Sequence, residues 1–134
     1  MNPWQFLLIG YPVTIAVETP ILLVGLSPRH SWKRRLFAGV WLTACTYPIV
    51  VLTMPELLYH DAGHRAPYLL VAETFAPVAE CTLFWLAFGE RKEFGRRSMW
   101  WDFAAITTAN LASFGIGEVI IALDGWTKLT AWLF

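Results

Sequence analysis

Apolar stretches of about 20 residues alternate with short polar segments along the chain, and this pattern predicts membrane-spanning helices. Four stretches reach that length, at residues 3–26, 36–59, 68–88 and 99–123. A helix of a soluble bundle carries a polar stripe on the side that faces water, and these stretches lack one. We therefore expect an all-α integral membrane protein in which four transmembrane helices form a single domain over residues 1–134.

The overall composition agrees with a chain that is embedded in lipid. Hydrophobic residues make up 57% of the sequence and charged residues 15%, whereas soluble domains average about 45–50% and about 25%. The formal net charge is +0, and the chain has no basic tail. The lipid bilayer is therefore an expected partner and nucleic acid is not.

The basic residues predict how the helices are oriented. Eight of the ten Lys and Arg residues lie in two connecting segments, 27–35 and 89–97. Short loops rich in Lys and Arg stay in the cytoplasm. We therefore expect both segments on the cytoplasmic side of the cell (inner) membrane, with the segment 60–67 and both the N- and C-termini outside.

Glutamates inside the apolar stretches form the most informative pattern. Glu18 and Glu56 lie in the first and second stretches, and adding 62 to each number gives Glu80 and Glu118 in the third and fourth. An ungapped comparison of the two 39-residue segments that these acids bound gives only six identities, five of them charged residues. A charge at the centre of a membrane helix costs at least about 2.5–3.5 kcal/mol. Because these energetically costly acids recur at the same spacing, the sequence predicts an internal duplication.

The predicted duplication has two copies, approximately residues 11–58 and 73–120, and each copy is a helical hairpin. An even number of spans in a repeat gives both copies the same orientation in the membrane. We therefore expect parallel repeats that are related by a pseudo-two-fold axis along the membrane normal.

The acids are expected at two depths in the bilayer. Glu18 and Glu80 lie eight residues before the cytoplasmic ends of their stretches, which is about 12 Å along a helix and near the middle of the membrane. Glu56 and Glu118 lie near the outer ends, and Glu73 precedes Glu80 by seven residues on the same helix face. Because no Lys or Arg lies at that depth, we expect the five acids to be protonated, hydrogen-bonded to one another or bound to a cation.

Polar residues surround these acids. Tyr11 takes the place of Glu73 in the first copy, and Thr108 and Asn110 give the fourth stretch a polar middle. Prolines in the same stretches free the carbonyl oxygen four residues earlier. Carboxylate and carbonyl oxygens together suit Ca²⁺, Mg²⁺ or Na⁺, so a bound cation is the one cofactor the sequence suggests. The alternative is that the acids only hold helices together by hydrogen bonds.

A second prediction concerns a metal site in the outer segment. Glu56, His60 and His64 are spaced four residues apart, with Asp61 beside them. If the second helix continues through this segment, the three share one face, and two imidazoles with a carboxylate suit Zn²⁺. A glycine and a proline in the same segment favour a turn equally, and the histidines are then solvated or tune a nearby acid with pH.

Small residues recur at every fourth position of the fourth stretch, at Ala105, Ala109, Ser113 and Gly117. This spacing lets another helix approach closely. It predicts a packing surface, either within the four-helix unit or between subunits.

Two functions fit this set of residues. One is transport: the intramembrane glutamates form a cation- or proton-binding site in an ion channel or transporter that acts as a homo-oligomer. The other is a non-enzymatic accessory or structural subunit of a larger membrane complex, which suits the short loops but has little need of five intramembrane acids. An enzyme is not expected and no catalytic residue is predicted, because the spans contain neither a nucleophile–base pair nor a histidine to complete a di-metal site.

Overall fold

The computed structural model describes residues 3–62, 65–90, 95–125 and 128, and the side chains of residues 59–62 and 65 lie outside this description. Within it the chain is helical and contains no strand. The elements in chain order are α1 (Pro3–Gly25), α2 (Trp32–Pro48), the π-helical turn η1 (Ile49–Thr53), α3 (Met54–Ala62), α4 (Arg65–Phe88) and α5 (Arg97–Ala122).

Four helical segments of the described chain are long and apolar enough to cross a membrane. They are Pro3–Gly25, Trp32–Leu58, Ala66–Phe88 and Arg97–Ala122. The prediction of four such helices is confirmed, and each bound lies within four residues of the one expected from the apolar pattern. The second segment is continuous through α2, η1 and part of α3, so the π-helical turn widens this helix without ending it.

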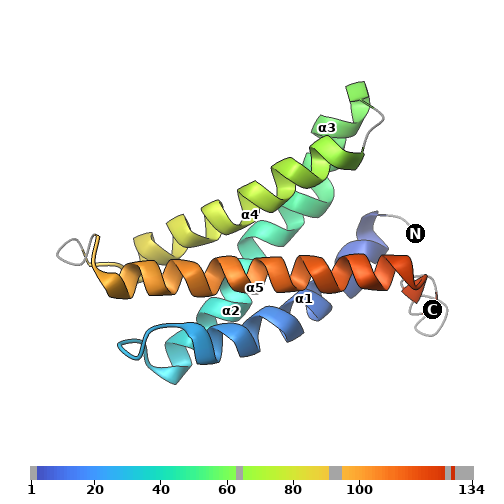
Figure 1. Cartoon of the computed structure of the whole chain (residues 1–134). Helices are drawn as coiled ribbons and strands as arrows, with labels where there is room; N and C mark the ends of the chain where they lie inside the picture. The colour runs from blue at the N-terminus through green and yellow to red at the C-terminus, as the bar shows by residue number, and fades with distance from the viewer. Residues whose placement is uncertain (1–2, 63–64, 91–94, 126–127, 129–134) are drawn as a thin grey trace.

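The four long segments form a four-sided bundle. α1 packs mainly against α2 and α5, and α4 packs mainly against the same two helices. α1 begins and α5 ends at one end of the bundle, which we call the terminal end, and the α1–α2 and α4–α5 connections lie at the other, which we call the loop end (Figure 1). α4 and α3 run obliquely away from α5 toward the terminal end (Figure 1).

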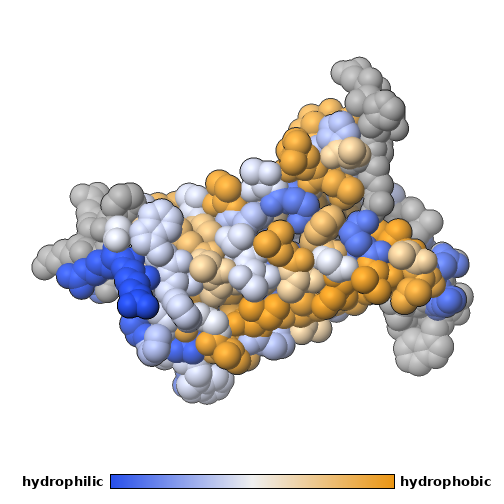
Figure 2. Space-filling view, in the orientation of Figure 1, coloured by the Kyte–Doolittle hydropathy of each residue, from blue (hydrophilic) through white to orange (hydrophobic). Residues whose placement is uncertain are grey.

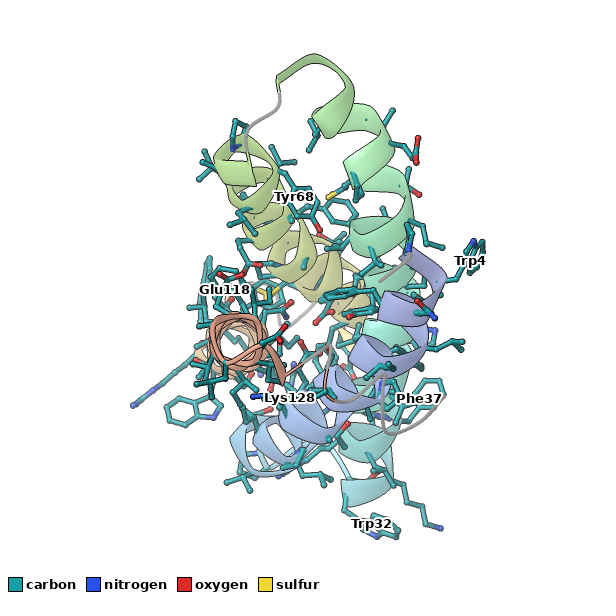
Figure 3. The ribbon with its side chains drawn as sticks, turned by 90° about the vertical axis from the view of Figure 1, so that its right-hand side faces the viewer. Trp4, Trp32, Phe37, Tyr68, Glu118 and Lys128 are labelled. Atoms are coloured by element: carbon teal, nitrogen blue, oxygen red, sulfur yellow. The ribbon has the colours of Figure 1, made fainter. Side chains whose placement is uncertain are left out.

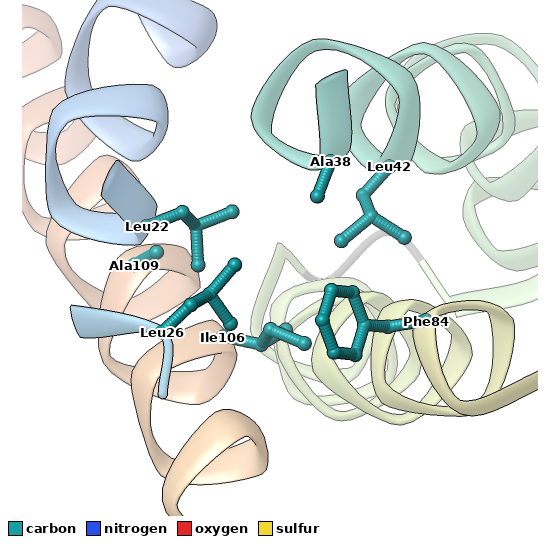
Figure 4. Packing of buried hydrophobic residues seen from close by; sticks show 7 residues of the cluster. All are labelled: Leu22, Leu26, Ala38, Leu42, Phe84, Ile106 and Ala109. Atoms are coloured by element: carbon teal, nitrogen blue, oxygen red, sulfur yellow. The ribbon is translucent and has the colours of Figure 1, made fainter. Parts of the chain in front are cut away.

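The buried apolar core lies in the half of the bundle next to the loop end. It is made by the last turns of α1 and α4 and the first halves of α2 and α5. Its seven buried side chains are Leu22, Leu26, Ala38, Leu42, Phe84, Ile106 and Ala109 (Figure 4). In lipid, van der Waals contact rather than removal from water holds such a core together.

Glycine allows α1 and α2 to approach closely. A Cβ atom at Gly39 would lie 2.7 Å from Thr19 Oγ1 and 2.9 Å from Thr19 Cα, and a Cβ atom at Gly10 would collide with the hydroxyl of Tyr47. The close approach at Gly39 holds Thr43, one turn further along α2, within hydrogen-bond reach of α1. Gly39 thus helps to position Thr43, which belongs to the candidate site described below.

The outer surface is apolar over much of its area. Large apolar side chains are exposed on all four segments, among them Val24, Leu57, Leu70 and Val119. Figure 2 shows apolar residues along much of the visible face, and strongly hydrophilic residues at the loop end, at the terminal end and at a few positions between them. This distribution suits a helix bundle in lipid. The expected orientation, with the loop end in the cytoplasm, stays a prediction.

Candidate cation and proton site

Glu18 on α1 and Glu80 on α4 are buried inside the bundle, each with 2% of its surface exposed. Each lies about two turns before the end of its helix at the loop end, so the two acids are at similar depth. α1 and α4 both pack against α2 and α5, and the acids therefore reach the interior from opposite sides. Both line the same internal cavity.

Two hydroxyl groups hold the Glu18 carboxyl. The hydroxyl of Thr43 on α2 donates to Glu18 Oε2 at 2.7 Å, and the hydroxyl of Ser113 on α5 donates to Glu18 Oε1 at 2.6 Å. These lengths are typical of well-formed hydrogen bonds between oxygen atoms. One acid on α1 therefore connects to both of its neighbouring helices.

The Glu80 carboxyl is held by the same two helices. The hydroxyl of Thr46 on α2 donates to Glu80 Oε1 at 2.7 Å, and the amide of Asn110 on α5 donates to Glu80 Oε2 at 2.8 Å. The second amide hydrogen of Asn110 faces the carbonyl oxygen of Ile106 at 3.0 Å. All four carboxyl oxygens of the pair are therefore hydrogen-bonded, as buried polar groups require.

The donors on the two helices follow a two-fold pattern. On each helix the first donor reaches the acid of the preceding helix, and the second, three residues later, reaches the acid on the opposite side. These donors are Thr43 and Thr46 on α2, and Asn110 and Ser113 on α5. Equivalent donors are 67 residues apart, whereas the acids are 62 apart. The hydrogen bonds thus relate α2 to α5 at an offset that an ungapped comparison does not detect.

Three of the four donors are hydroxyl groups that also lie near a carbonyl oxygen of their own helix. The oxygen–oxygen distances are 2.9 Å from Thr43 to Gly39, 3.1 Å from Thr46 to Leu42 and 2.9 Å from Ser113 to Asn110. A hydroxyl has one hydrogen to donate. It donates to an ionised carboxylate, but when the acid carries a proton it accepts that hydrogen and turns its own to the carbonyl. The geometry therefore accommodates both protonation states without movement of a helix.

A cavity of about 290 Å³ extends from the two acids toward the terminal end. Its wall includes Glu73 on α4 and Glu118 on α5 as well as Glu18 and Glu80, and no Lys, Arg or His is among the described residues that line it. Figure 3 views the bundle from the terminal end and labels Tyr68 on α4 and Glu118 on α5, which belong to this wall. Four of the five predicted acids therefore share one internal space.

The apolar core closes the cavity on the side of the loop end. Leu22 and Phe84 each follow a cavity acid by four residues, and Leu42 and Ala109 each precede a donor by one. These side chains are at most 2% exposed. The cavity therefore ends at the pair of acids and does not pass through the bundle.

A second buried polar cluster near the loop end was not predicted from the sequence. The Asp102 carboxylate on α5 accepts hydrogen bonds from the Ser27 N–H at 2.7 Å and the Arg29 guanidinium at 2.8 Å, and lies 3.0 Å from His30 Nε2. Asp102 is 1% exposed and His30 3%. The cluster ties the end of α1 to the first turns of α5. The position of Asp102, at the start of an apolar stretch and next to a basic loop, could have indicated this cluster. The comparison at a shift of 62 residues did not detect it, because Asp102 corresponds there to Val40.

Three other predicted residues do not reach the two buried acids. The side chains of Glu56 and Thr108 are exposed, and neither is among the residues that line the cavity. Tyr11 is half-buried, with its ring 6.1 Å from that of Tyr47, which does line the cavity. Of the predicted supporting residues, only Asn110 contacts a buried acid directly.

The hypothesis of a metal site at His60, Asp61 and His64 falls on side chains that lie outside the described residues. Among the residues that the structure does describe, no group of three or more His, Cys, Asp or Glu side chains is placed to hold a metal ion. The four cavity acids are therefore distributed along a wall and do not converge on one point.

The row of small residues on α5 faces the inside of the bundle. Ala109 is buried, Gly117 lines the cavity, and Ser113 bonds to an acid on α1. A Cβ atom at Gly25 would lie 3.1 Å from the Cβ atom of Ala105. Of the two alternatives left by the sequence, the structure places this surface within the four-helix unit, between α5 and α1.

The chain was compared with protein-family models, with curated proteins and with solved structures. No family model matches it. No curated protein and no solved structure matches it either.

Proposed function

We propose that the chain is a membrane transporter that binds protons or cations at Glu18 and Glu80. One observation carries the proposal: two buried carboxyl groups line the same end of a cavity, and no Lys, Arg or His is among the described residues that line it. The hydrogen bonds to both carboxyl groups suit the charged and the protonated acid. Intramembrane acids that face a cavity are typical of ion and proton pathways.

The shape of the cavity favours a carrier over a channel. A channel needs a continuous path, but here the apolar core and the Asp102 cluster separate the acids from the loop end. A carrier exposes its site to one side at a time. We infer that transport exposes the acids to the loop end when the core and the Asp102 cluster separate.

The groups around the site explain why it would take up positive charge. Among the described residues, the titratable side chains that line the cavity are all carboxyl or phenol groups. They come from all four spans: Glu18 on α1, Tyr47 on α2, Tyr68, Glu73 and Glu80 on α4, and Glu118 on α5. None of these groups is a base that is charged at neutral pH. Burial disfavours negative charges on both Glu18 and Glu80, so a proton or a cation is the species that the site would bind.

We also propose that the protein acts as a homo-oligomer in the cell membrane, with its loop end in the cytoplasm. Basic residues at the loop end support the orientation. The described residues of one chain already bring together both buried acids and their four hydrogen-bond donors, so the oligomer is not needed to assemble the acid pair. Light scattering in detergent tests this part of the proposal, and a monomeric mass for an active protein contradicts it.

The decisive experiment measures proton flux in liposomes that contain the purified protein and a pH-sensitive dye. We expect proton flux driven by a pH gradient, with an exchangeable inorganic or organic monovalent cation on the opposite side of the membrane, for the wild type and a return to the rate of empty liposomes for Glu18→Gln and for Glu80→Gln. Glu56→Gln is the matched control, because it removes an acid that is exposed and lies outside the cavity wall. Equal flux in all four proteins contradicts a role for the buried pair.

An accessory subunit is the second candidate, and one observation favours it. The two acids join α1 and α4 to both α2 and α5 through four hydrogen bonds, which is how polar side chains hold membrane helices together. In that case the wild type carries no flux. Glu→Gln then changes little, since glutamine still hydrogen-bonds, while Glu→Leu destabilises the bundle.

A further inference from the structure

The cavity next to the acid pair is larger than an inorganic ion requires. Its volume is about 290 Å³, whereas a water molecule in the liquid occupies about 30 Å³ and small-molecule pockets begin near 300 Å³. A metal ion also needs several ligands that converge on one point, and the described residues contain no group of three or more His, Cys, Asp or Glu side chains that could hold one. The space therefore suits a small organic molecule.

Each of the four spans contributes one aromatic ring to the cavity wall. The rings are those of Phe6 on α1, Tyr47 on α2, Tyr68 on α4 and Phe114 on α5. The face of an aromatic ring attracts organic cations, and several rings around one space form the kind of cage that binds quaternary ammonium groups. Aliphatic side chains such as Val13 fill the wall between the rings.

The four rings follow the same two offsets as the acids and their donors. Phe6 and Tyr68 are 62 residues apart, as are the buried acids, and Tyr47 and Phe114 are 67 apart, as are the equivalent donors. The two aromatic pairs therefore support the same correspondence between helices as the hydrogen bonds do, through different residues. The rings and the acids therefore belong to one two-fold site.

The charged side chains of the cavity wall determine the sign of the charge that a ligand must carry. Glu73 and Glu118 line the wall together with the buried pair, and no basic side chain is among the described residues that do so. An anion would meet the like charges of Glu18 and Glu80, and a neutral molecule would leave these two buried carboxylates, whose hydrogen-bond partners are neutral, without a counter-charge. A positively charged ligand with apolar substituents matches both the acids and the rings.

We propose that the cavity binds a monovalent organic cation, a quaternary or protonated amine with apolar substituents, and that this cation competes with protons for Glu18 and Glu80. The inference rests on the proposed function, because it names the substrate that the transporter exchanges for protons. An ionised acid holds the cation, and a proton that neutralises the acid releases it. Charge is balanced in this exchange, since one monovalent cation leaves for each proton that binds.

Binding of benzyltrimethylammonium to the purified protein in detergent, measured by titration calorimetry, tests the inference. We expect saturable binding that weakens as the pH falls, and no binding of benzenesulfonate, which has a similar shape and the opposite charge. Benzyltrimethylammonium should also raise the temperature of thermal unfolding, as any ligand of the folded state does. Absence of both signals, or equal binding of the two probes, overturns the inference.

Variants then locate the binding site. The double substitution Glu18→Gln with Glu80→Gln should weaken binding at least tenfold, and Phe114→Leu should weaken it while every acid is kept. Glu56→Gln, the exposed control, should bind as the wild type does. Circular dichroism and gel filtration show which variants are folded, and normal binding by a folded Glu18/Glu80 double variant contradicts the proposed site.

The outcomes separate this inference from the proposed function. If proton flux depends on the buried acids but benzyltrimethylammonium does not bind, the transporter stands and its proposed substrate class is wrong. If the cation binds in the acid-dependent manner but neither it nor protons cross the liposome membrane, the binding site stands and transport is wrong.

Discussion

Tyr68 on α4 donates a hydrogen bond from its hydroxyl to the carbonyl oxygen of Val50 at 3.1 Å. In η1 the N–H of Met54 bonds to the carbonyl oxygen of Ile49, five residues earlier. The same spacing would pair position 55 with Val50, but Pro55 has no N–H to donate. Tyr68 therefore satisfies a carbonyl that the proline leaves unpaired, and the bond holds its ring in the cavity wall.

The substitution Tyr68→Phe should lower the stability of the bundle by about 1–3 kcal/mol, because it leaves the Val50 carbonyl without its donor. Thermal unfolding in detergent, followed by circular dichroism, measures the loss. Tyr11→Phe is the matched control: the Tyr11 ring contacts Tyr47, and phenylalanine keeps that contact. Equal unfolding temperatures for the two variants would show that the Tyr68 hydroxyl contributes nothing.

The substitution Gly39→Ala should destabilise the contact between α1 and α2. The added Cβ atom would lie 2.9 Å from the Cα atom of Thr19, and because this neighbour is backbone, the helices must separate. Overpacking of this kind costs about 1–3 kcal/mol. Gly115→Ala is the control, since a Cβ atom there meets nothing within 4 Å. A Gly39→Ala variant as stable as Gly115→Ala would contradict the close approach.

The four long helices were predictable because an apolar stretch of about 20 residues indicates a helix that is long enough to cross a membrane. The bounds of the four spans follow from it. The burial of Glu18 and Glu80 inside the bundle was predictable, because a charged residue within an apolar stretch is costly and therefore easy to recognise in a single sequence. Their common depth follows from counting residues to the helix ends, and the structure places both acids at the same level of the bundle.

The partners of the acids were not predictable, because they depend on how the helices are rotated and shifted against one another. Thr43 and Thr46 look like ordinary polar residues of a membrane helix, and only packing shows that each faces a different acid. The ungapped shift of 62 matched Thr46 with Thr108, which is exposed. Ser113 holds the equivalent place at an offset of 67, which a comparison with a gap in the loop would have allowed.

The substitution Asp102→Ala should destabilise the loop end of the bundle, because it removes the acceptor that Ser27 and Arg29 share. Loss of hydrogen bonds to a buried charged group costs about 1.5–3 kcal/mol each. Asp102→Asn should cost less, since its side-chain oxygen still accepts a bond. Glu90→Gln, at an exposed position of the same end, is the control. If the Asp102→Ala variant is as stable as the Glu90→Gln variant, the Asp102 cluster does not stabilise the bundle.

The shared hydroxyl groups lead to a prediction about the proton itself. If Glu80 carries a proton, its hydroxyl donates to the Thr46 oxygen 2.7 Å away, and the Thr46 hydrogen turns to the Leu42 carbonyl. Thr46→Val keeps the size of the side chain and removes this partner. In infrared difference spectra between low and high pH, the carbonyl stretch of the protonated acid should move to higher frequency in the variant, because the acid loses a hydrogen bond. Glu80→Gln should abolish the band and so assign it.

Thr108→Val is the control for this experiment, since it makes the same change at an exposed position of α5 that the hydrogen-bond network does not include. Its spectrum should match that of the wild type. A band that is absent in the wild type at every pH would mean that the buried acids do not exchange protons with the solvent. A band that is present but unmoved by Thr46→Val would mean that Glu80 does not hold the proton. If Glu18 holds it, Thr43→Val shifts the band; if an acid in the outer part of the cavity holds it, neither variant does.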